Sequence, residues 1–221
     1  MLTRHVGPRL RAVHDAGATE PAWKDLLRLY AELQIEFAAD ADVALELGTP
    51  DERVQTLAVK ATQLSAGEDA VRRVAAAAAR LSDTLAPTVV HMEAHDGNIF
   101  LRNGSAVFID WAEAVVTHPF LGPLLPLRFA TERLGYAPGS PEVERLRDAY
   151  LDPFTSFAPM AELRASFADA YLLSPICRAH GWHEIVGGLQ PSVSEAYGDP
   201  VRGWLEILRG LLNGSVVLGG A

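Results

Sequence analysis

The sequence has very little cysteine and no long hydrophobic run. Cys177 is the single cysteine among 221 residues, so the chain cannot form an internal disulfide, and this indicates a reducing compartment. The N-terminal residues lack the apolar stretch of a signal peptide, and no run of about 18 apolar residues occurs anywhere. These absences predict a cytoplasmic protein with neither a leader peptide nor a membrane span.

Positive charge is also scarce, and lysine is nearly absent. Lysine and arginine together number 19 against 28 acids, which gives a formal net charge of −9, and the only lysines are Lys24 and Lys60. Such a protein is a poor partner for nucleic acid or an anionic membrane, and we expect neither. The rest of the composition, 49% hydrophobic and 21% charged, is ordinary for a globular protein, and we expect one domain over residues 1–221.

Most of the chain carries the apolar spacing of amphipathic helices. Trp23, Leu26 and Tyr30, for example, recur at three- and four-residue intervals after Pro21. The expected helices cover residues 21–39, 40–47, 50–64, 68–85, 119–135, 141–151, 160–185 with a kink at Pro175, and 200–212. We therefore expect a mainly α fold of the α+β type, in which helices at 20–86 and 119–212 surround a small central β-hairpin sheet.

Residues 88–113 interrupt the helices with this β region. The expected elements are a strand at Thr88–Val90 and a hairpin with arms Ile99–Arg102 and Ser105–Asp110 around the turn Asn103-Gly104. Asn-Gly between two β-rich segments is a strong hairpin signal, because both central residues of a type I′ turn need a positive φ. Closing the hairpin brings Asp110 back beside Asn98, so polar side chains meet at one end of the sheet.

The loop before the hairpin has the side chains that phosphoryl transfer to a hydroxyl requires. Such a reaction uses a carboxylate to accept the hydroxyl proton, and an amide and a second carboxylate to hold Mg²⁺ on the phosphates. The spacing His-x-acid-x-x-x-x-Asn is that of a kinase catalytic loop, and here it runs His91, Glu93, Asn98. Asp110, at the end of the following hairpin, stands where the second metal ligand is needed.

The segments HMEAHDGNIF and FIDWAEA together resemble the catalytic and metal loops of the aminoglycoside phosphotransferase and choline kinase-like family. The family pattern is His-Gly-Asp-x-His-x-x-Asn followed by Ile-Asp-Trp, and this chain departs from it at two positions, with Met92 for Gly and Glu93 for the catalytic Asp. The resemblance implies the helical C-terminal lobe of a protein kinase-like fold, with ATP and Mg²⁺ as cofactors and a small-molecule acceptor.

Each of the following residues of these loops has an expected role, and Asn98 and Asp110 also have a structural alternative. The roles are Glu93 and His95 for catalysis; Asn98 and Asp110 for the metal; His91, Asp96 and Trp111 for loop structure; and Glu113 and His118 for substrate at the pocket rim. The structural alternatives are that Asn98 caps the loop and that Asp110 ends its strand in a turn hydrogen bond. Asp96 precedes a glycine, and we expect it to be a turn residue.

The N-terminal lobe of such a kinase has no counterpart in this sequence. The residues before Pro21 are too few for that β-rich lobe, and no Gly-x-Gly-x-x-Gly occurs. Leu57-Ala58-Val59-Lys60 resembles the kinase lysine motif, but it falls within an expected helix, where a solvated surface lysine is the default. The lobe is supplied by another chain, is missing by truncation, or was lost. In the first case a partner chain or self-association would cover the surface of the missing lobe.

Three functions follow from these observations. The first is ATP- and Mg²⁺-dependent phosphoryl transfer to a hydroxyl of a small molecule, once an N-terminal lobe is supplied. The second is an enzyme of secondary metabolism in which Glu93 performs cyclisation, elimination or isomerisation without nucleotide. The third is a pseudokinase-like binding module that joins another chain.

Overall fold

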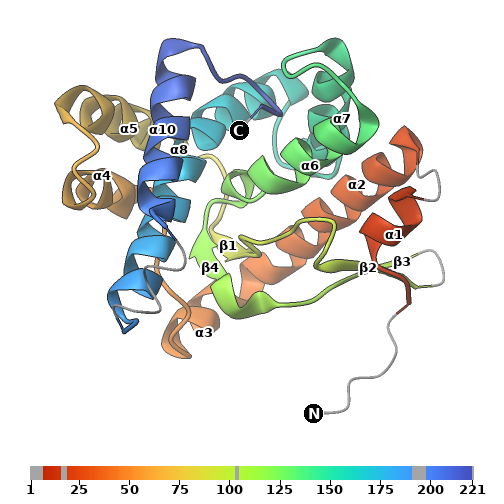
Figure 1. Cartoon of the computed structure of the whole chain (residues 1–221), viewed down its shortest axis with the longest axis horizontal. Helices are drawn as coiled ribbons and strands as arrows, with labels where there is room; N and C mark the ends of the chain where they lie inside the picture. The colour runs from red at the N-terminus through yellow and green to blue at the C-terminus, as the bar shows by residue number, and fades with distance from the viewer. Residues whose placement is uncertain (1–6, 16–18, 103–104, 191–197, 221) are drawn as a thin grey trace.

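The computed structural model describes residues 7–15, 19–102, 105–190 and 198–220. In these residues the helices are α1 (Leu10–Asp15), α2 (Glu20–Phe37), α3 (Ala41–Glu46), α4 (Val54–Gln63), α5 (Glu68–Leu81), α6 (Leu124–Leu134), α7 (Pro141–Leu151), α8 (Met160–Gly187) and α10 (Pro200–Asn213). Short 3-10 helices lie at Ala38–Asp40, Trp111–Glu113, Pro119–Leu121 and Asp152–Ser156. The fold is mainly helical, as the apolar spacing predicts (Figure 1).

Two small antiparallel sheets lie among these helices. β2 (Ile99–Arg102) pairs with β3 (Ser105–Phe108) in the expected hairpin, with Ile99 opposite Phe108. The second arm ends two positions earlier than predicted, and the predicted Asn103-Gly104 turn lies outside the described residues. β1 (Thr88–Val90) pairs with β4 (Val115–Thr117), a strand that the sequence did not predict because its three residues are too few for a periodic signal.

The predicted start of α4 at Pro50 is wrong. Residues 50–52 run extended beside β4, where the Glu52 amide donates to the Val116 carbonyl at 2.9 Å and the Val116 amide donates to the Pro50 carbonyl at 2.9 Å. These bonds satisfy the backbone of residues 50–52 outside the helix, so α4 begins only at Val54. The segment therefore lies parallel to β4 along the edge of that strand that β1 does not pair with.

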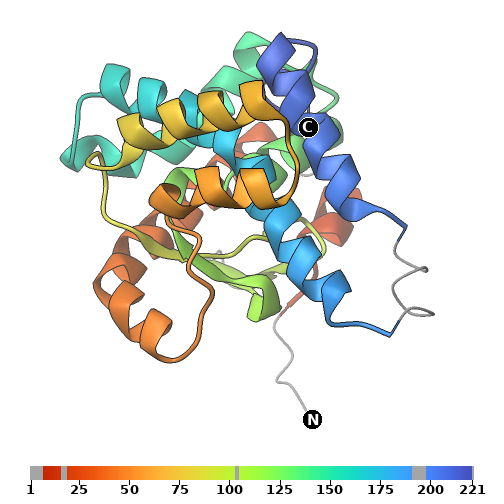
Figure 2. The same ribbon diagram turned by 90° about the vertical axis from the view of Figure 1, so that its left-hand side faces the viewer.

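α8 is the central helix of the molecule. It continues through Pro175, so the proline sits inside the helix, and its buried residues include Phe167, Leu173 and Ile176. Helices α4 and α5 lie against one side of α8, and α10 packs along it (Figure 2). α2 lies on the opposite part of the core, where it contributes the fully buried Trp23. No helix in the described ranges is long and apolar enough to cross a bilayer.

The C-terminal tail, which the sequence pattern left unplaced, packs onto the helical body. The Gly139 amide donates to the Leu218 carbonyl at 2.8 Å, and the Gly219 amide donates to the Tyr171 hydroxyl at 3.0 Å. Gly219 has a φ of +80°, and a Cβ there would lie 2.4 Å from the Thr131 hydroxyl oxygen. Only glycine fits this approach, so the tail is held in one path against α6, α7 and α8.

Candidate functional site

Residues 91–98 form a loop (the 91–98 loop) that is tied directly to the end of the β2–β3 hairpin. The Ile109 amide donates to the Asn98 carbonyl at 3.0 Å, and His91 Nε2 lies 2.7 Å from the Ile109 carbonyl oxygen. His91 Nδ1 accepts from the Glu93 amide at 3.1 Å, so the ring bonds through both nitrogens as a neutral imidazole. Burial lowers the His91 pKa, which favours this neutral form. The loop that bears Glu93 and Asn98 is thus fixed beside the residue before Asp110.

Asp110 follows the hairpin in a left-handed conformation. Its φ of 63° is one of two positive values at non-glycine residues in the described part of the chain, and its side chain is exposed. This conformation costs an L-residue about 1–2 kcal/mol, although aspartate tolerates it better than most. Asn98 Nδ2 donates to the Glu93 carbonyl at 3.2 Å, which leaves its Oδ1 as the atom able to bind a cation. An amide oxygen and a carboxylate therefore flank the junction between loop and hairpin.

Arg178, a residue that the sequence patterns did not single out, holds the acids of the site. From α8 its guanidinium donates to the Glu93 carboxylate, to Glu113 Oε2 at 3.1 Å and to the Met92 carbonyl at 3.0 Å. Its side chain is only 5% exposed, and the Trp204 ring lies 5.1 Å from its guanidinium carbon. One feature of the sequence could have identified Arg178. It stands within the apolar helical run around Cys177, and an arginine in such a run is buried only when it is paired.

Glu113 lies beside Arg178 and lines a pocket, and its expected role in binding a substrate there stays a prediction. Burial raises the pKa of Glu113, and the negative charge of Glu93 adds to the effect, whereas the Arg178 guanidinium opposes it. Two carboxyl groups, Glu93 and Glu113, thus share one guanidinium.

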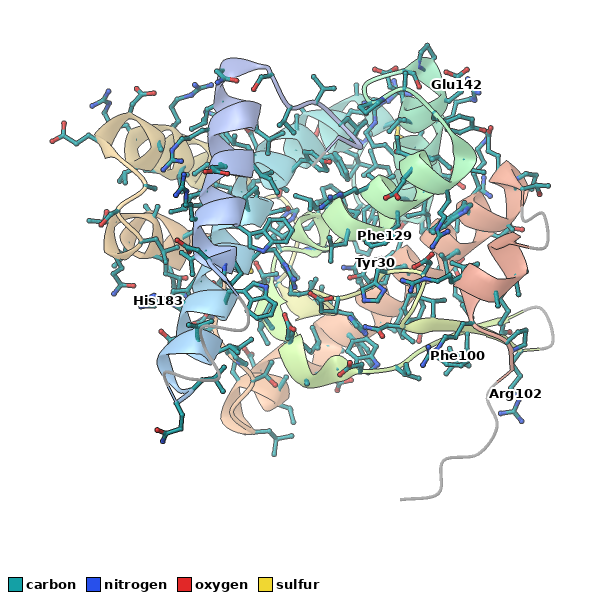
Figure 3. The ribbon with its side chains drawn as sticks, in the orientation of Figure 1. Tyr30, Phe100, Arg102, Phe129, Glu142 and His183 are labelled. Atoms are coloured by element: carbon teal, nitrogen blue, oxygen red, sulfur yellow. The ribbon has the colours of Figure 1, made fainter. Side chains whose placement is uncertain are left out.

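His95 spans the short distance between the loop backbone and Glu93. Its Nδ1 accepts from the Gly97 amide at 3.0 Å, and its Nε2 lies 3.5 Å from Glu93 Oε2. The ring faces Phe129 of α6, with 5.4 Å between centroids, and Phe129 lies near the middle of the molecule in Figure 3. A Cβ at Gly97 would lie 2.8 Å from the His95 ring, so glycine at that position leaves room for the imidazole.

Asp96 lies in a turn, as its Asp-Gly sequence predicts, because the Asn98 amide donates to the His95 carbonyl at 2.9 Å across Asp96 and Gly97. Its carboxylate is fully buried, and it pairs with Arg11 of α1 at 2.8 Å and with Arg133 of α6 at 2.8 Å. The Arg11 amide also donates to the Asp96 carbonyl at 3.1 Å. The sequence patterns did not predict these ion pairs, because the two arginines come from distant parts of the chain and no local pattern connects them to Asp96. Asp96 thereby ties the 91–98 loop to two helices.

Trp111 and His118 both take part in packing. The Trp111 ring lies 4.6 Å from His91 between centroids, and its Nε1 donates to the Phe108 carbonyl at 3.0 Å. The predicted place of His118 at the pocket rim is wrong, because this side chain is 3% exposed. Its Nδ1 accepts from the Phe120 amide at 3.2 Å and its Nε2 lies 3.0 Å from the Thr84 hydroxyl. Burial lowers the His118 pKa to about 3, so the ring is neutral at pH 7.

Lys60 is likewise not the solvated lysine that its helical context predicts. The extended segment 50–52 folds over α4, and Lys60 Nζ lies 2.7 Å from Glu52 Oε1 and 2.5 Å from the Asp51 carbonyl oxygen. His180 Nδ1 of α8 lies 2.7 Å from the same Glu52 oxygen. Lys60 is therefore an ion-pair partner of Glu52, with its own side chain 13% exposed.

The comparisons with known proteins agree with this architecture. A solved structure titled "Structure of the GDP and kanamycin complex of APH(2")-IIia" superposes with a TM-score of 0.57, covering 96% of this chain and 70% of that one at 12% identity. Among curated proteins, none matches this sequence. The sequence profile described as "Phosphotransferase enzyme family" matches residues 2–122, more than half of the chain and the whole 91–98 loop. The chain belongs to the phosphotransferase enzyme family.

Proposed function

We propose that this chain carries the catalytic and acceptor-binding lobe of a small-molecule phosphotransferase. The proposed reaction moves the γ-phosphoryl group of ATP to a hydroxyl group of the acceptor. The related solved structure is titled as a complex with GDP and kanamycin, so a protein of this fold binds a nucleotide and a small hydroxylated molecule. Family membership supports the reaction class, and the chemistry of the 91–98 loop supports the assignment of roles.

One observation carries the proposal: the hydrogen bond from the Ile109 amide to the Asn98 carbonyl at 3.0 Å. This hydrogen bond joins the 91–98 loop, which carries Glu93 and Asn98, to Ile109, the residue before Asp110. A proton acceptor and two oxygen ligands are then supplied by two adjacent backbone segments, which is the arrangement that a kinase active site needs. The left-handed backbone of Asp110 also fits this view, because strained conformations concentrate at functional sites.

Asn98 and Asp110 fit a magnesium ion in chemistry and in number. Mg²⁺ prefers hard oxygen ligands, takes one or two from the protein and keeps phosphate oxygens or waters for the rest. Asn98 Oδ1 and the exposed Asp110 carboxylate offer such ligands. When bound, the ion would neutralise charge on the transferred phosphoryl group.

Glu93 is the proposed general base. The acceptor hydroxyl gives its proton to the Glu93 carboxylate as its oxygen attacks the γ-phosphorus, and ADP leaves with the electrons of the broken bond. Arg178 fixes the orientation of Glu93 by donating to one of its oxygens. His95, with Nε2 at 3.5 Å from the other oxygen, is placed to orient the same carboxylate.

Phosphoryl transfer from ATP to a panel of alcohols and sugars, followed by ³¹P NMR, tests the proposal. The assay is run with the chain alone and with the nucleotide-binding lobe of a related phosphotransferase added. The proposal expects product that depends on Mg²⁺ and disappears in Glu93→Gln. No nucleotide binding and no product under either condition would contradict it.

A second function is favoured by the position of two acids beside one guanidinium. Arg178 donates to both Glu93 and Glu113, and burial raises the pKa of Glu113, which keeps a proton on that group to higher pH. Two acids with separated roles can act as a general acid and a general base without any nucleotide. Turnover of a substrate without ATP, lost in both Glu93→Gln and Glu113→Gln, would support this function over phosphoryl transfer.

A further inference from the structure

A pocket of about 150 Å³ lies behind Arg178, between α8 and the β1–β4 sheet. Its walls come from segment 50–52, Met92, segment 112–115 and the part of α8 between Cys177 and Ile185. We call it the Glu52 pocket. Apolar side chains and backbone make up most of the wall, and the polar groups come from a few residues, as in sites that bind small molecules.

Two buried polar atoms of the residues that line the Glu52 pocket have no hydrogen-bond partner. In the described part of the chain, Glu52 Oε2 and Arg178 Nε are both buried and unsatisfied. The Glu52 side chain is 3% exposed and that of Arg178 is 5% exposed, so bulk water does not reach them freely. The Cys177 thiol lies beside the Glu52 carboxyl group, but a thiol is only a weak donor. An unsatisfied buried polar atom costs about 1–3 kcal/mol, which a ligand with matching groups would recover.

Each acid of the Glu52 pocket wall already has a basic side chain of the protein within 4 Å. Glu52 pairs with Lys60 at 2.7 Å, and Glu113 pairs with Arg178 at 3.1 Å. Glu184, the third acid of the wall, lies 3.9 Å from His180. A cationic ligand would compete with these cations for the acids, and an anionic ligand would compete with the acids. The pocket therefore favours a neutral molecule over a polycation.

We propose that the Glu52 pocket binds a compact, neutral, mostly apolar molecule with a hydroxyl group, of the size of a phenol or a cyclic alcohol. The hydroxyl group can donate to Glu52 Oε2 or accept from Arg178 Nε, and the apolar body would pack against the apolar part of the pocket wall. A cavity of about 150 Å³ is large enough for a benzene-sized ring. Arg178 of the pocket wall donates to Glu93, and Met92 precedes Glu93 in the chain, so the bound molecule would lie next to the proposed base. The inference deepens the proposed function by naming a class of ligand at the same site, and to that extent it rests on that function.

Methyl NMR with matched aromatic probes tests the binding directly and needs no nucleotide. Phenol is titrated first, and the methyl signals of Met92, Val115 and Ile185 report on the pocket because these residues line it. Benzene lacks the hydroxyl group, benzylammonium is a cation and benzoate is an anion of similar size. We expect phenol to shift these methyl signals at millimolar concentration, benzene to bind at least 5-fold more weakly, and each charged probe at least 10-fold more weakly.

A pair of glycine variants separates the pocket from the rest of the surface. Gly181 lies on the pocket wall within α8, and a Cβ added there meets no atom within 4 Å, so Gly181→Leu extends into the space without a backbone clash. Gly203, exposed on α10, also has no atom within 4 Å of an added Cβ, and Gly203→Leu is the matched control. Both changes place a better helix former in a helix, so both variants should fold.

We expect Gly181→Leu to weaken phenol binding at least 10-fold and Gly203→Leu to leave it unchanged. Three results would overturn the pocket assignment: no methyl shift with phenol at 20-fold excess over millimolar protein, equal binding of the charged probes, or equal binding of phenol to both glycine variants. Water would then be the partner of the two unsatisfied atoms. If phenol binds as expected but no condition gives phosphoryl transfer, the pocket stands and the proposed function fails.

Discussion

The Arg178 guanidinium of α8 holds the carboxylate of Glu93, 85 positions away in the chain. The same guanidinium donates to Glu113 and to the Met92 carbonyl, so a single buried side chain fixes both acids and the backbone between His91 and Glu93. Arginine suits this role because its planar fork can donate to several acceptors at once. The orientation of the proposed base thus depends on a helix distant from the 91–98 loop in sequence.

Arg178→Lys should lower kcat of the proposed phosphoryl transfer by about 10- to 100-fold, because an ammonium cannot reach all three acceptors and a misplaced base is inefficient. KM for ATP should change little. Arg80→Lys is the control, since Arg80 pairs with Asp169 on the surface and its side chain is 59% exposed. Equal rates for both variants would show that Arg178 does not position the base.

Glu93→Gln should lower kcat by about 100- to 10,000-fold, because the amide keeps the shape of the side chain but accepts no proton. The free energy of unfolding is measured alongside by urea titration, so that loss of the Arg178 pair can be separated from loss of the base. Glu113→Gln should retain at least a tenth of the activity if phosphoryl transfer is the reaction. A variant at Glu93 that keeps full activity would remove Glu93 from the mechanism.

Asp96→Asn should destabilise the fold by about 2 kcal/mol. The change removes the charge that faces Arg11 and Arg133 inside the protein, although both arginines retain partial access to water that offsets some of the loss. Asp69→Asn is the matched control, because the Asp69–Arg72 pair is about 70% exposed on both sides and should contribute under about 0.5 kcal/mol. Urea unfolding of the two variants gives the comparison, and similar values for both would refute a structural role of the Asp96 ion pairs.

Protein stability should fall as the pH drops below about 6.5, in part because of His118. Burial lowers the pKa of this residue from 6.5 to about 3, so between these values the unfolded chain binds a proton that the folded chain does not. The contribution to stability is complete above the unfolded pKa and decreases toward pH 3, by about 2 kcal/mol between pH 7 and pH 5.

His118→Gln tests this pH dependence by urea unfolding at both pH values. The wild-type protein should lose about 2 kcal/mol more than the variant between pH 7 and pH 5. His183→Gln, at an exposed position of α8 that Figure 3 labels, should keep the wild-type pH dependence. Identical slopes for the wild type and His118→Gln would show that the buried imidazole is not the source of the pH dependence.

The parts of the fold that sequence reasoning predicted well rest on local interactions. The range of α7, Pro141–Leu151, matches the expected one because apolar spacing and a proline at the first helical position act within the segment itself. The start of α4 was missed because residues 50–52 pair with β4, more than 60 positions away. Pairing at that distance leaves no periodic trace in the sequence.

The same distinction applies to the candidate site. The loop and hairpin that carry Glu93, Asn98 and Asp110 could be located from local turn and strand signals. The partners of the buried charges, such as Arg178 for Glu93 and Arg133 for Asp96, depend on how helices pack onto the loop. For that reason the turn at Asp96 could be predicted but its ion pairs could not, and the prediction of Lys60 as a solvated lysine was wrong.

Isothermal titration of ATP with Mg²⁺ into the wild type, Asp110→Asn and Asp69→Asn tests the central claim most directly. Asp110→Asn replaces the carboxylate of one proposed metal ligand, after the second arm of the hairpin, by a neutral amide that binds Mg²⁺ more weakly, whereas Asp69 lies on the surface of α5. The titration is run with and without the nucleotide-binding lobe of a related phosphotransferase. We predict that ATP binding depends on Mg²⁺ and weakens at least 10-fold in Asp110→Asn but not in Asp69→Asn. Absence of binding in the wild type, or equal binding in all three proteins, would contradict a nucleotide–metal site at Asn98 and Asp110.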